Sequence, residues 1–205
     1  MRAGARITRT IYEKIYREAE AYWATRKNNY HVPCSYDFAH RLLSFHPSAE
    51  PDIVLPAVLL HDVGWKMVPE NKQRGAFGPE VKDREMQRFH ETEGVRIAGE
   101  ILHSLDYDKE KTAEILSIID GHDTREQPLS LNDKLVKDAD KLWRFTPYCV
   151  KIAYRHFGFE LESYIHLLGQ KIDAWFFTDE AKAMAREELN RAGKELLTPP
   201  SEREA

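Results

Sequence analysis

The segment IVLPAVLLHDVGWK, residues 53–66, contains the longest apolar run of the sequence and indicates the fold most clearly. Its first eight residues are apolar on every side, which is typical of a helix buried in a core. Pro56 would sit in the first turn of this helix, and Gly64 would mark its end. A short buried strand is the alternative, because short apolar runs do not distinguish the two. His61 and Asp62 directly follow the run, so two polar side chains are expected at the inner end of a buried element.

The sequence on either side of this stretch is helical, because apolar residues recur every three or four positions. Helices are predicted over about 8–27, 35–45, 83–104, 109–121 and 131–144, with two or three more within 147–195. Ser130 and Thr178 are expected as N-terminal caps. The expected fold is therefore all-α, a single-domain helical bundle over 1–205.

Residues 65–82 break the helical pattern, with two prolines and two glycines among them. A loop of this length inside a compact domain is typically functional or mobile. The tail 198–205, which contains two prolines, is expected to fray.

Composition excludes several classes of protein. Apolar residues make up 42% and charged residues 31% of the 205 residues, which is not the composition of a disordered chain. The formal net charge is −4, with no dense basic run, so the chain is not expected to bind nucleic acid or anionic membranes. No segment approaches 18 consecutive apolar residues, so no membrane span is expected.

The cysteines and the N-terminus indicate a cytoplasmic protein. Cys34 and Cys149 lie far apart and fit neither a zinc site nor a disulfide framework, so they are expected to be reduced thiols. The segment 1–23 mixes charged with apolar residues and does not have the pattern of a secretory signal.

Histidines and aspartates at inward or helix-end positions suggest a metal site. Nine histidines are present, and imidazole is the commonest metal ligand in proteins. Residues of the ligand type fall on five expected helices: His40, His61, Asp62, His90, His122 and Asp140. A nitrogen and oxygen ligand set suits zinc, iron, manganese or cobalt. Gly94, one turn after His90, would let another backbone approach closely.

The order of these residues resembles that of the HD superfamily of metal-dependent phosphohydrolases. The surrounding segments are similar too: LLHDVGWK at 59–66, HETEGVRIAGEIL at 90–102, IIDGHD at 118–123 and KLVKDADKL at 134–142. The resemblance covers about 35–145, and the helices of about 147–195 would pack on this core.

The resemblance implies one or two divalent metal ions, with Fe, Mn, Zn, Co, Ni or Mg as candidates. His40, His61, Asp62 and Asp140 would bind the first ion. Asp62 would bridge to a second ion completed by His90 and His122, as in the two-metal subset of the family. In single-metal members these two histidines face the substrate phosphate instead. Helical pattern alone does not separate Asp138 from Asp140, but the family's Ala-Asp dipeptide selects Asp140.

The implied reaction is hydrolysis of a phosphate ester or phosphoanhydride, with a small phosphorylated substrate, above all a nucleotide. Asp62 and Lys66 are the expected catalytic residues, although many relatives have their lysine one position earlier, where this chain has Trp65. The candidate substrate-binding cations are Lys66, Arg74, Lys141 and Arg144, each of which could equally be a solvated surface charge. Glu91 could assist proton transfer, but a surface glutamate is the commoner case.

Two alternatives remain at this stage. Some HD-fold oxygenases hold two irons with four histidines and two aspartates, although the 18-residue gap from His122 to Asp140 is closer to the hydrolases. The chain could also be a non-catalytic nucleotide-binding module, and it is compatible with a homo-oligomer. The remaining histidines are expected at the surface or in ordinary packing: His31, His46, His103, His156 and His166.

Overall fold

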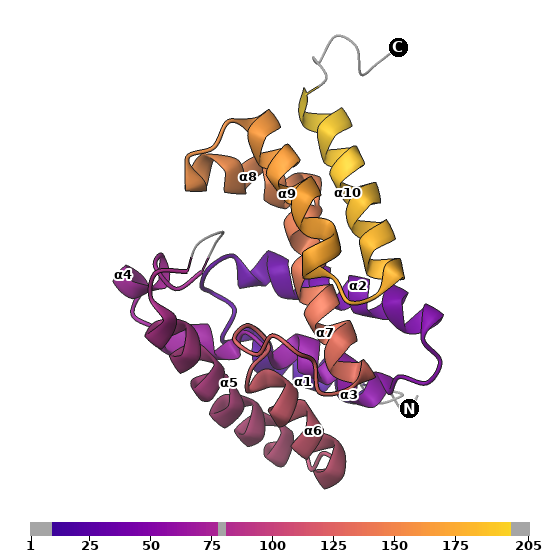
Figure 1. The fold of residues 1–205 in the computed structure, drawn as a ribbon. Helices are drawn as coiled ribbons and strands as arrows, with labels where there is room; N and C mark the ends of the chain where they lie inside the picture. The colour runs from indigo at the N-terminus through magenta and orange to yellow at the C-terminus, as the bar shows by residue number, and fades with distance from the viewer. Residues whose placement is uncertain (1–9, 78–80, 198–205) are drawn as a thin grey trace, which may run out of the picture.

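The computed structural model describes residues 10–77 and 81–197, and within these ranges it contains helices and no strand (Figure 1). The all-α prediction is therefore confirmed. The helices follow in the order α1 (Ile11–Glu20), α2 (Asn28–Phe45), α3 (Pro51–Leu60), the 3-10 helix η1 (Val63–Met67), α4 (Glu70–Gln73), α5 (Arg84–Ser104), α6 (Lys109–Ile119), α7 (Leu131–Leu142), the 3-10 helix η2 (Trp143–Phe145), α8 (Pro147–Phe157), α9 (Leu161–Trp175) and α10 (Asp179–Leu197).

Helix α3 lies at the centre of the bundle. Every side chain from Ile53 to Leu60 is buried, and the helix packs against α1, α2, α6 and α7. The buried-helix interpretation is thus confirmed over the strand alternative. Pro51 occupies the first turn, so Pro56 lies inside the helix rather than at its start as expected.

Gly64 does not end helix α3, which was the expectation, but lies within η1. Its role is close packing against α5. A Cβ atom at Gly64 would lie 1.9 Å from the carbonyl oxygen of His90 and 2.4 Å from the amide nitrogen of Gly94. Only glycine allows this contact, so the predicted close backbone approach at Gly94 is present.

The N-terminal helices divide differently from the prediction. The helix expected over 8–27 ends at Glu20, and its first two positions lie outside the described residues. The chain then turns through Arg26 and Lys27, both in the left-handed region with φ of 48° and 65°. Helix α2 therefore begins at Asn28, seven residues before the expected start.

Side-chain caps fix the starts of α5, α6, α7 and α10. Ser130 accepts a hydrogen bond from the amide of Asp133 at 3.2 Å, and Thr178 accepts one from Ala181 at 3.3 Å, so both predicted caps are present. Asp83 and Asp108 cap α5 and α6 in the same way.

The segment expected to be an irregular loop at 65–82 contains the end of η1 and the short helix α4. Trp65, Val68 and Ala76 form a small apolar cluster beneath it. Residues 78–80 of this loop, like the tail 198–205, lie outside the described residues.

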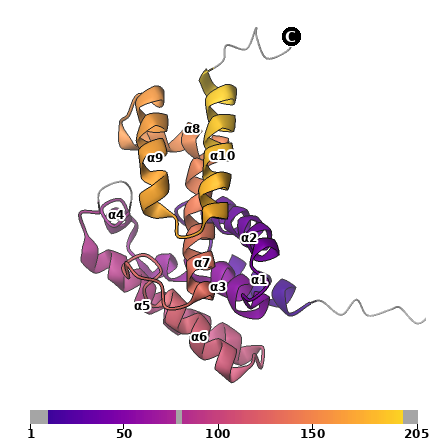
Figure 2. The same ribbon diagram turned by 45° about the vertical axis from the view of Figure 1, so that its right-hand side comes forward.

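The C-terminal helices α8, α9 and α10 pack on one another, and α10 also contacts α7 (Figure 2). One apolar core runs through the fold from Ile15 in α1 to Ala192 in α10. No helix in the described part of the chain combines the length and the apolar character needed to cross a lipid bilayer.

Candidate metal centre

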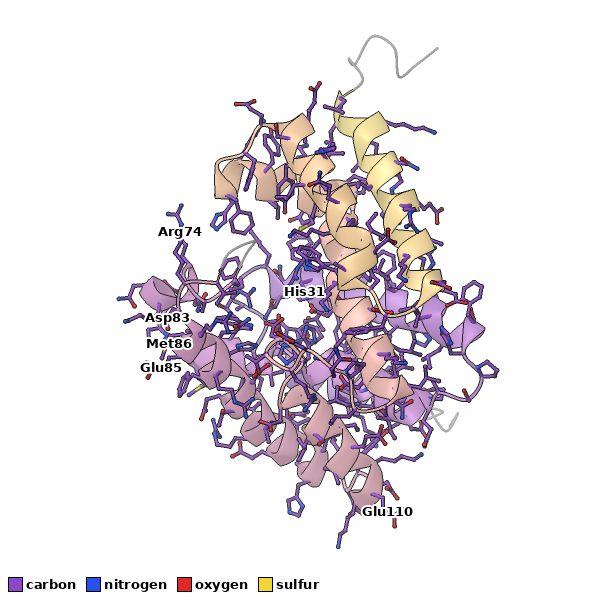
Figure 3. The ribbon with its side chains drawn as sticks, viewed as in Figure 1. His31, Arg74, Asp83, Glu85, Met86 and Glu110 are labelled. Atoms are coloured by element: carbon purple, nitrogen blue, oxygen red, sulfur yellow. The ribbon has the colours of Figure 1, made fainter. Side chains whose placement is uncertain are left out.

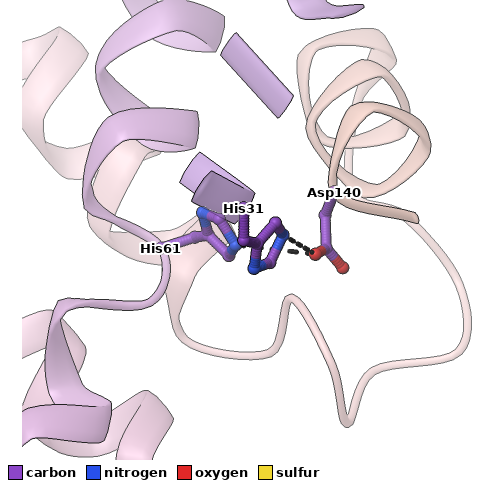
Figure 4. Close-up of side chains that lie close together, drawn as sticks. All are labelled: His31, His61 and Asp140. Carbon is purple, nitrogen blue, oxygen red and sulfur yellow. Dashed lines mark ion pairs between the residues drawn. The ribbon is translucent and has the colours of Figure 1, made fainter. Parts of the chain in front are cut away.

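Three helices bring His31, His61 and Asp140 together in the interior (Figure 4). His31 comes from α2, His61 from the C-terminal end of α3 and Asp140 from α7. Asp140 Oδ1 lies 2.9 Å from His31 Nε2 and 3.6 Å from His61 Nε2. All three residues are buried, and one ligand atom from each lies within 4.8 Å of the others.

Asp62 completes this first group from the turn between α3 and η1. Its Oδ2 atom lies 3.2 Å from Nδ1 of His31 and 3.7 Å from Nε2 of His61. Its Oδ1 atom accepts a hydrogen bond from the indole nitrogen of Trp65 at 3.0 Å. The carboxylate is 3% exposed and is therefore held among nitrogen donors rather than solvent.

A second group lies on the other side of Asp62. His90 comes from α5, and His122 and Asp123 come from the loop after α6. The two Nε2 atoms are 3.3 Å apart, and Asp123 Oδ2 lies 3.7 Å from Nε2 of His90. Asp62 Oδ1 lies 3.5 Å from Nε2 of His122, so this carboxylate stands between the two groups.

Backbone carbonyls orient two of these imidazoles. Nδ1 of His61 lies 2.7 Å from the carbonyl oxygen of Val58, and Nδ1 of His122 lies 3.0 Å from that of Ile119. A carbonyl only accepts, so Nδ1 of each ring carries a proton, and the Nε2 atoms face the cluster. The Nε2 atom of His61 has no hydrogen-bond partner among the described residues. A buried unpaired acceptor beside two carboxylates fits a divalent cation.

The charge state of the cluster also suits a cation. Burial alone would raise the pKa of Asp62, but His61 and hydrogen bonds from His122 and His31 hold it well below its usual range. Burial would likewise raise the pKa of Asp140, but Arg144 and the two histidines beside it hold it well below normal. Both carboxylates are therefore ionised.

The pKa values of the two histidines in the second group are shifted in opposite directions. Burial and the charge of His122 lower the pKa of His90 to about 4. Burial opposes the charged form of His122 as well, but hydrogen bonding to Asp62 and the charges of Asp123 and Glu91 raise its pKa to about 9. Metal binding would therefore displace a proton from His122.

The structure places His31, and not His40, in the buried cluster. His40 is exposed on α2 and packs edge-on against Tyr36, whereas His31 occupies the buried position. The two residues are nine positions apart on one helix, and at about 100° per residue they point in nearly opposite directions. His31, expected at the surface or in ordinary packing, instead contacts both Asp62 and Asp140.

Arg26 is a cation that sequence reasoning missed. Its guanidinium lies 3.8 Å from the ring centre of Trp65 and 4.1 Å from that of Phe77, and Nη1 lies 3.9 Å from Asp62 Oδ2. Its Nε has no hydrogen-bond partner among the described residues. The residue spacing gave no sign of this role, because it predicted a helix over 8–27. In the structure that helix ends at Glu20, and Arg26 lies in the turn that follows it.

The four expected substrate-binding cations divide into two pairs. Lys66 and Arg74 are exposed, and Figure 3 shows Arg74 at the edge of the molecule and His31 in its interior. Lys141 and Arg144 are half-buried on the side of Asp140. Lys141 donates to the carbonyl of Trp175 at 3.2 Å. Burial opposes the charge of Arg144, but Asp140 and Asp123 outweigh it and raise its pKa.

The structure separates Asp138 from Asp140. Asp138 accepts hydrogen bonds from the amides of Phe177 and Thr178 at 2.9 and 3.0 Å, on the side of α7 away from the ligand cluster. Asp123, which sequence reasoning did not select, lies in the second group. The sequence feature that could have indicated Asp123 is its position directly after His122.

Glu91 is fully buried, which corrects the expectation of a surface glutamate. Its carboxylate accepts hydrogen bonds from Thr124 and Arg88 and from the amide of Asp123. Burial alone would raise the pKa of Glu91, but the charge of His122 and these donors lower it to about 2. The side chain is thus an ionised structural acceptor.

The fold and the cluster together define a helical protein with a buried histidine and aspartate centre. Residues 5–144 match the family model of the HD domain, so the chain belongs to the HD domain family. The match begins before the expected boundary at residue 35 and includes His31. No curated protein and no solved structure gave a significant match.

Proposed function

We propose that this protein is a metal-dependent phosphohydrolase that cleaves a phosphate ester or phosphoanhydride of a small molecule, with a nucleotide as the preferred class. The observation that carries the proposal is the convergence of His31, His61 and Asp140 with Asp62 at one buried point. His90, His122 and Asp123 would hold a second divalent ion on the other side of Asp62.

The residues present fit such ions. Imidazole nitrogens and carboxylate oxygens are the ligands of Zn²⁺, Mn²⁺, Fe²⁺ and Co²⁺ in hydrolytic sites. A bound ion would lower the pKa of a water molecule toward about 7 and so supply hydroxide near neutral pH. Asp62 would be the catalytic carboxylate of this proposal, because it borders both groups.

The cations around the cluster support an anionic substrate. Arg26 packs against the rings of Trp65 and Phe77 with one guanidinium nitrogen near Asp62, and Arg144 is held beside Asp140. A guanidinium offers paired N–H donors that match phosphoryl oxygens. Arg26 would bind the substrate phosphate and Arg144 would neutralise charge that develops during cleavage. Lys66, which is exposed, is less well placed for this role than Arg26.

The experiment is a hydrolysis assay of the full chain on nucleotides and phosphomonoesters with Mn²⁺, Co²⁺, Zn²⁺ or Mg²⁺. Asp62→Asn and His61→Ala should each abolish metal-dependent turnover, and His103→Ala, on the far part of α5, should leave it unchanged. Full activity of Asp62→Asn would contradict the proposal.

The same ligands could hold two irons, so the assay includes iron-loaded protein in air. Phosphate release without oxygen consumption supports the hydrolase. Oxygen consumption coupled to substrate oxidation would replace it with the oxygenase alternative. Nucleotide binding without turnover under any of these metals would indicate a binding module.

A further inference from the structure

The loop 121–125 carries two of the proposed second-site ligands, His122 and Asp123, yet it has no regular secondary structure to hold it. It begins at Gly121, whose φ of 148° suits glycine. An irregular loop positions ligands only if its backbone polar groups are fixed by partners outside the loop.

Lys137 supplies partners for the carbonyl groups. This side chain of α7 is 2% exposed, and its Nζ donates to the carbonyl oxygens of Gly121 at 2.7 Å, His122 at 2.7 Å and Arg125 at 2.9 Å. All three donors of the ammonium group are used on one loop. Among the described residues no carboxylate forms an ion pair with Lys137, so this buried charge serves the loop backbone.

Glu91 supplies partners for the amide groups from the opposite side. Its Oε1 atom accepts from the backbone N–H of Asp123 and of Thr124, both at 2.9 Å. Its Oε2 atom accepts from the hydroxyl of Thr124 at 2.6 Å and from Arg88 at 2.8 Å. The carboxylate is completely buried on α5, one residue after the ligand His90.

Glu91 and Lys137 therefore hold the loop from two sides, and we call this pair the clamp. An anion on α5 binds the loop's amides, and a cation on α7 binds its carbonyls. Removal of either charge takes these partners away from buried or part-buried backbone groups of the loop, which allows the loop to shift. A ligand shift of a few tenths of an ångström is enough to weaken metal binding, because coordination distances are tightly constrained.

We propose that Glu91 and Lys137 are positioning residues that preform the 121–125 loop and thereby set the affinity of the second ion, but not that of the first. This inference rests on the proposed metal centre. His31, His61 and Asp140 have no hydrogen bond to the loop 121–125 among the described residues, and Asp62, which borders both groups, lies 3.5 Å from Nε2 of His122. The clamp therefore acts mainly on the second group.

The test is titration of the metal-free full chain with Mn²⁺ alone, followed by calorimetry and by the electron paramagnetic resonance of the bound ions. Wild-type protein should bind two ions. Glu91→Gln and Lys137→Met should bind the first ion with an affinity within about threefold of wild type and the second at least about tenfold more weakly. Glu93→Gln and Lys134→Met are the matched controls on the same helices and should keep both sites.

Hydrogen exchange of wild-type protein provides a measurement that does not depend on the variants folding. Without metal, the amides of Asp123 and Thr124 should be protected at least about 100-fold relative to an unstructured chain. Unprotected amides in metal-free protein, one ion in the wild type, or a second-ion affinity unchanged in both folded variants would each overturn the clamp. Binding of no ion at all would overturn the proposed metal centre instead.

Discussion

Nε2 of His31 lies 2.9 Å from Oδ1 of Asp140, and this contact joins helix α2 to helix α7 inside the buried cluster. The pair lies at the crossing of two helices that are distant in sequence and packed in space. The first group of candidate metal ligands therefore depends on where α2 begins. A start at residue 35 would exclude His31 from the helix, whereas the start at Asn28 places its side chain in the core.

Replacement of Arg26 by Met should impair substrate binding more than the fold. The variant keeps an apolar side chain between Trp65 and Phe77 but loses the donors near Asp62. Hydrogen bonds to charged groups contribute about 1.5–3 kcal/mol, so kcat/KM for a phosphorylated substrate should fall about 10- to 100-fold, mainly through KM. Arg74→Met, at an exposed position, is the control and should match the wild type. Equal kinetics of both variants would exclude Arg26 from the binding site.

Replacement of Trp65 by Phe should weaken metal binding. Phenylalanine preserves the stacking on His90, whose ring centre lies 4.0 Å away, but cannot donate to Oδ1 of Asp62. Loss of a hydrogen bond to a ligating carboxylate typically costs 10- to 100-fold in metal affinity. Mn²⁺ titration against the control Trp175→Phe measures the effect, and an unchanged affinity would show that the indole nitrogen has no part in orienting Asp62.

Replacement of Gly64 by Ala should destabilise the protein strongly. The new Cβ would meet the carbonyl oxygen of His90 at 1.9 Å, so η1 and α5 would have to separate. A forced backbone shift in a packed core costs about 1–3 kcal/mol or more. Gly193→Ala in α10 has nothing within 4 Å of the added atom and should stabilise the fold by about 0.5–1 kcal/mol. Denaturant unfolding compares the two, and similar free energies of unfolding would contradict the packing described here.

Replacement of Asp52 by Asn should reduce stability near neutral pH and have little effect at low pH. Lys111 donates to Asp52 at 2.5 Å and Tyr12 donates to it as well, and these contacts lower the pKa of Asp52. A lowered carboxyl pKa contributes stability above the pKa of the unfolded chain, and that contribution is lost as the pH falls through the folded value. Solvent screens this half-exposed pair, so the loss should be about 0.5 kcal/mol. A difference between variant and wild type that persists unchanged at pH 2 would contradict this assignment.

The sequence was sufficient for the features that depend on local pattern. The apolar run before His61 predicted a buried helix, and Ser130 and Thr178 predicted two helix starts. Burial and capping can be predicted in this way because each requires particular residue types at adjacent positions in the sequence. Asp62, His90 and Asp140 were also correctly expected to face inward.

Other features depended on the path of the chain in space. The break before Asn28 requires left-handed backbone at Arg26 and Lys27. Neither residue is a glycine or a proline, the residue types by which a turn is usually predicted from sequence. The choice between His31 and His40 followed from that break. The buried charges of Glu91 and Lys137 were missed because their partners are backbone groups of a loop, and backbone groups leave no pattern in a sequence.

The most direct test of the account is the metal content of the purified full chain, measured by elemental analysis for wild type, His31→Ala and His40→Ala. Wild type and His40→Ala should each carry two divalent ions per chain, and His31→Ala should lose at least the ion of the first group while it remains helical by circular dichroism. Full metal content in His31→Ala together with loss in His40→Ala would contradict the central claim that α2 contributes its buried histidine, and not its exposed one, to the metal centre.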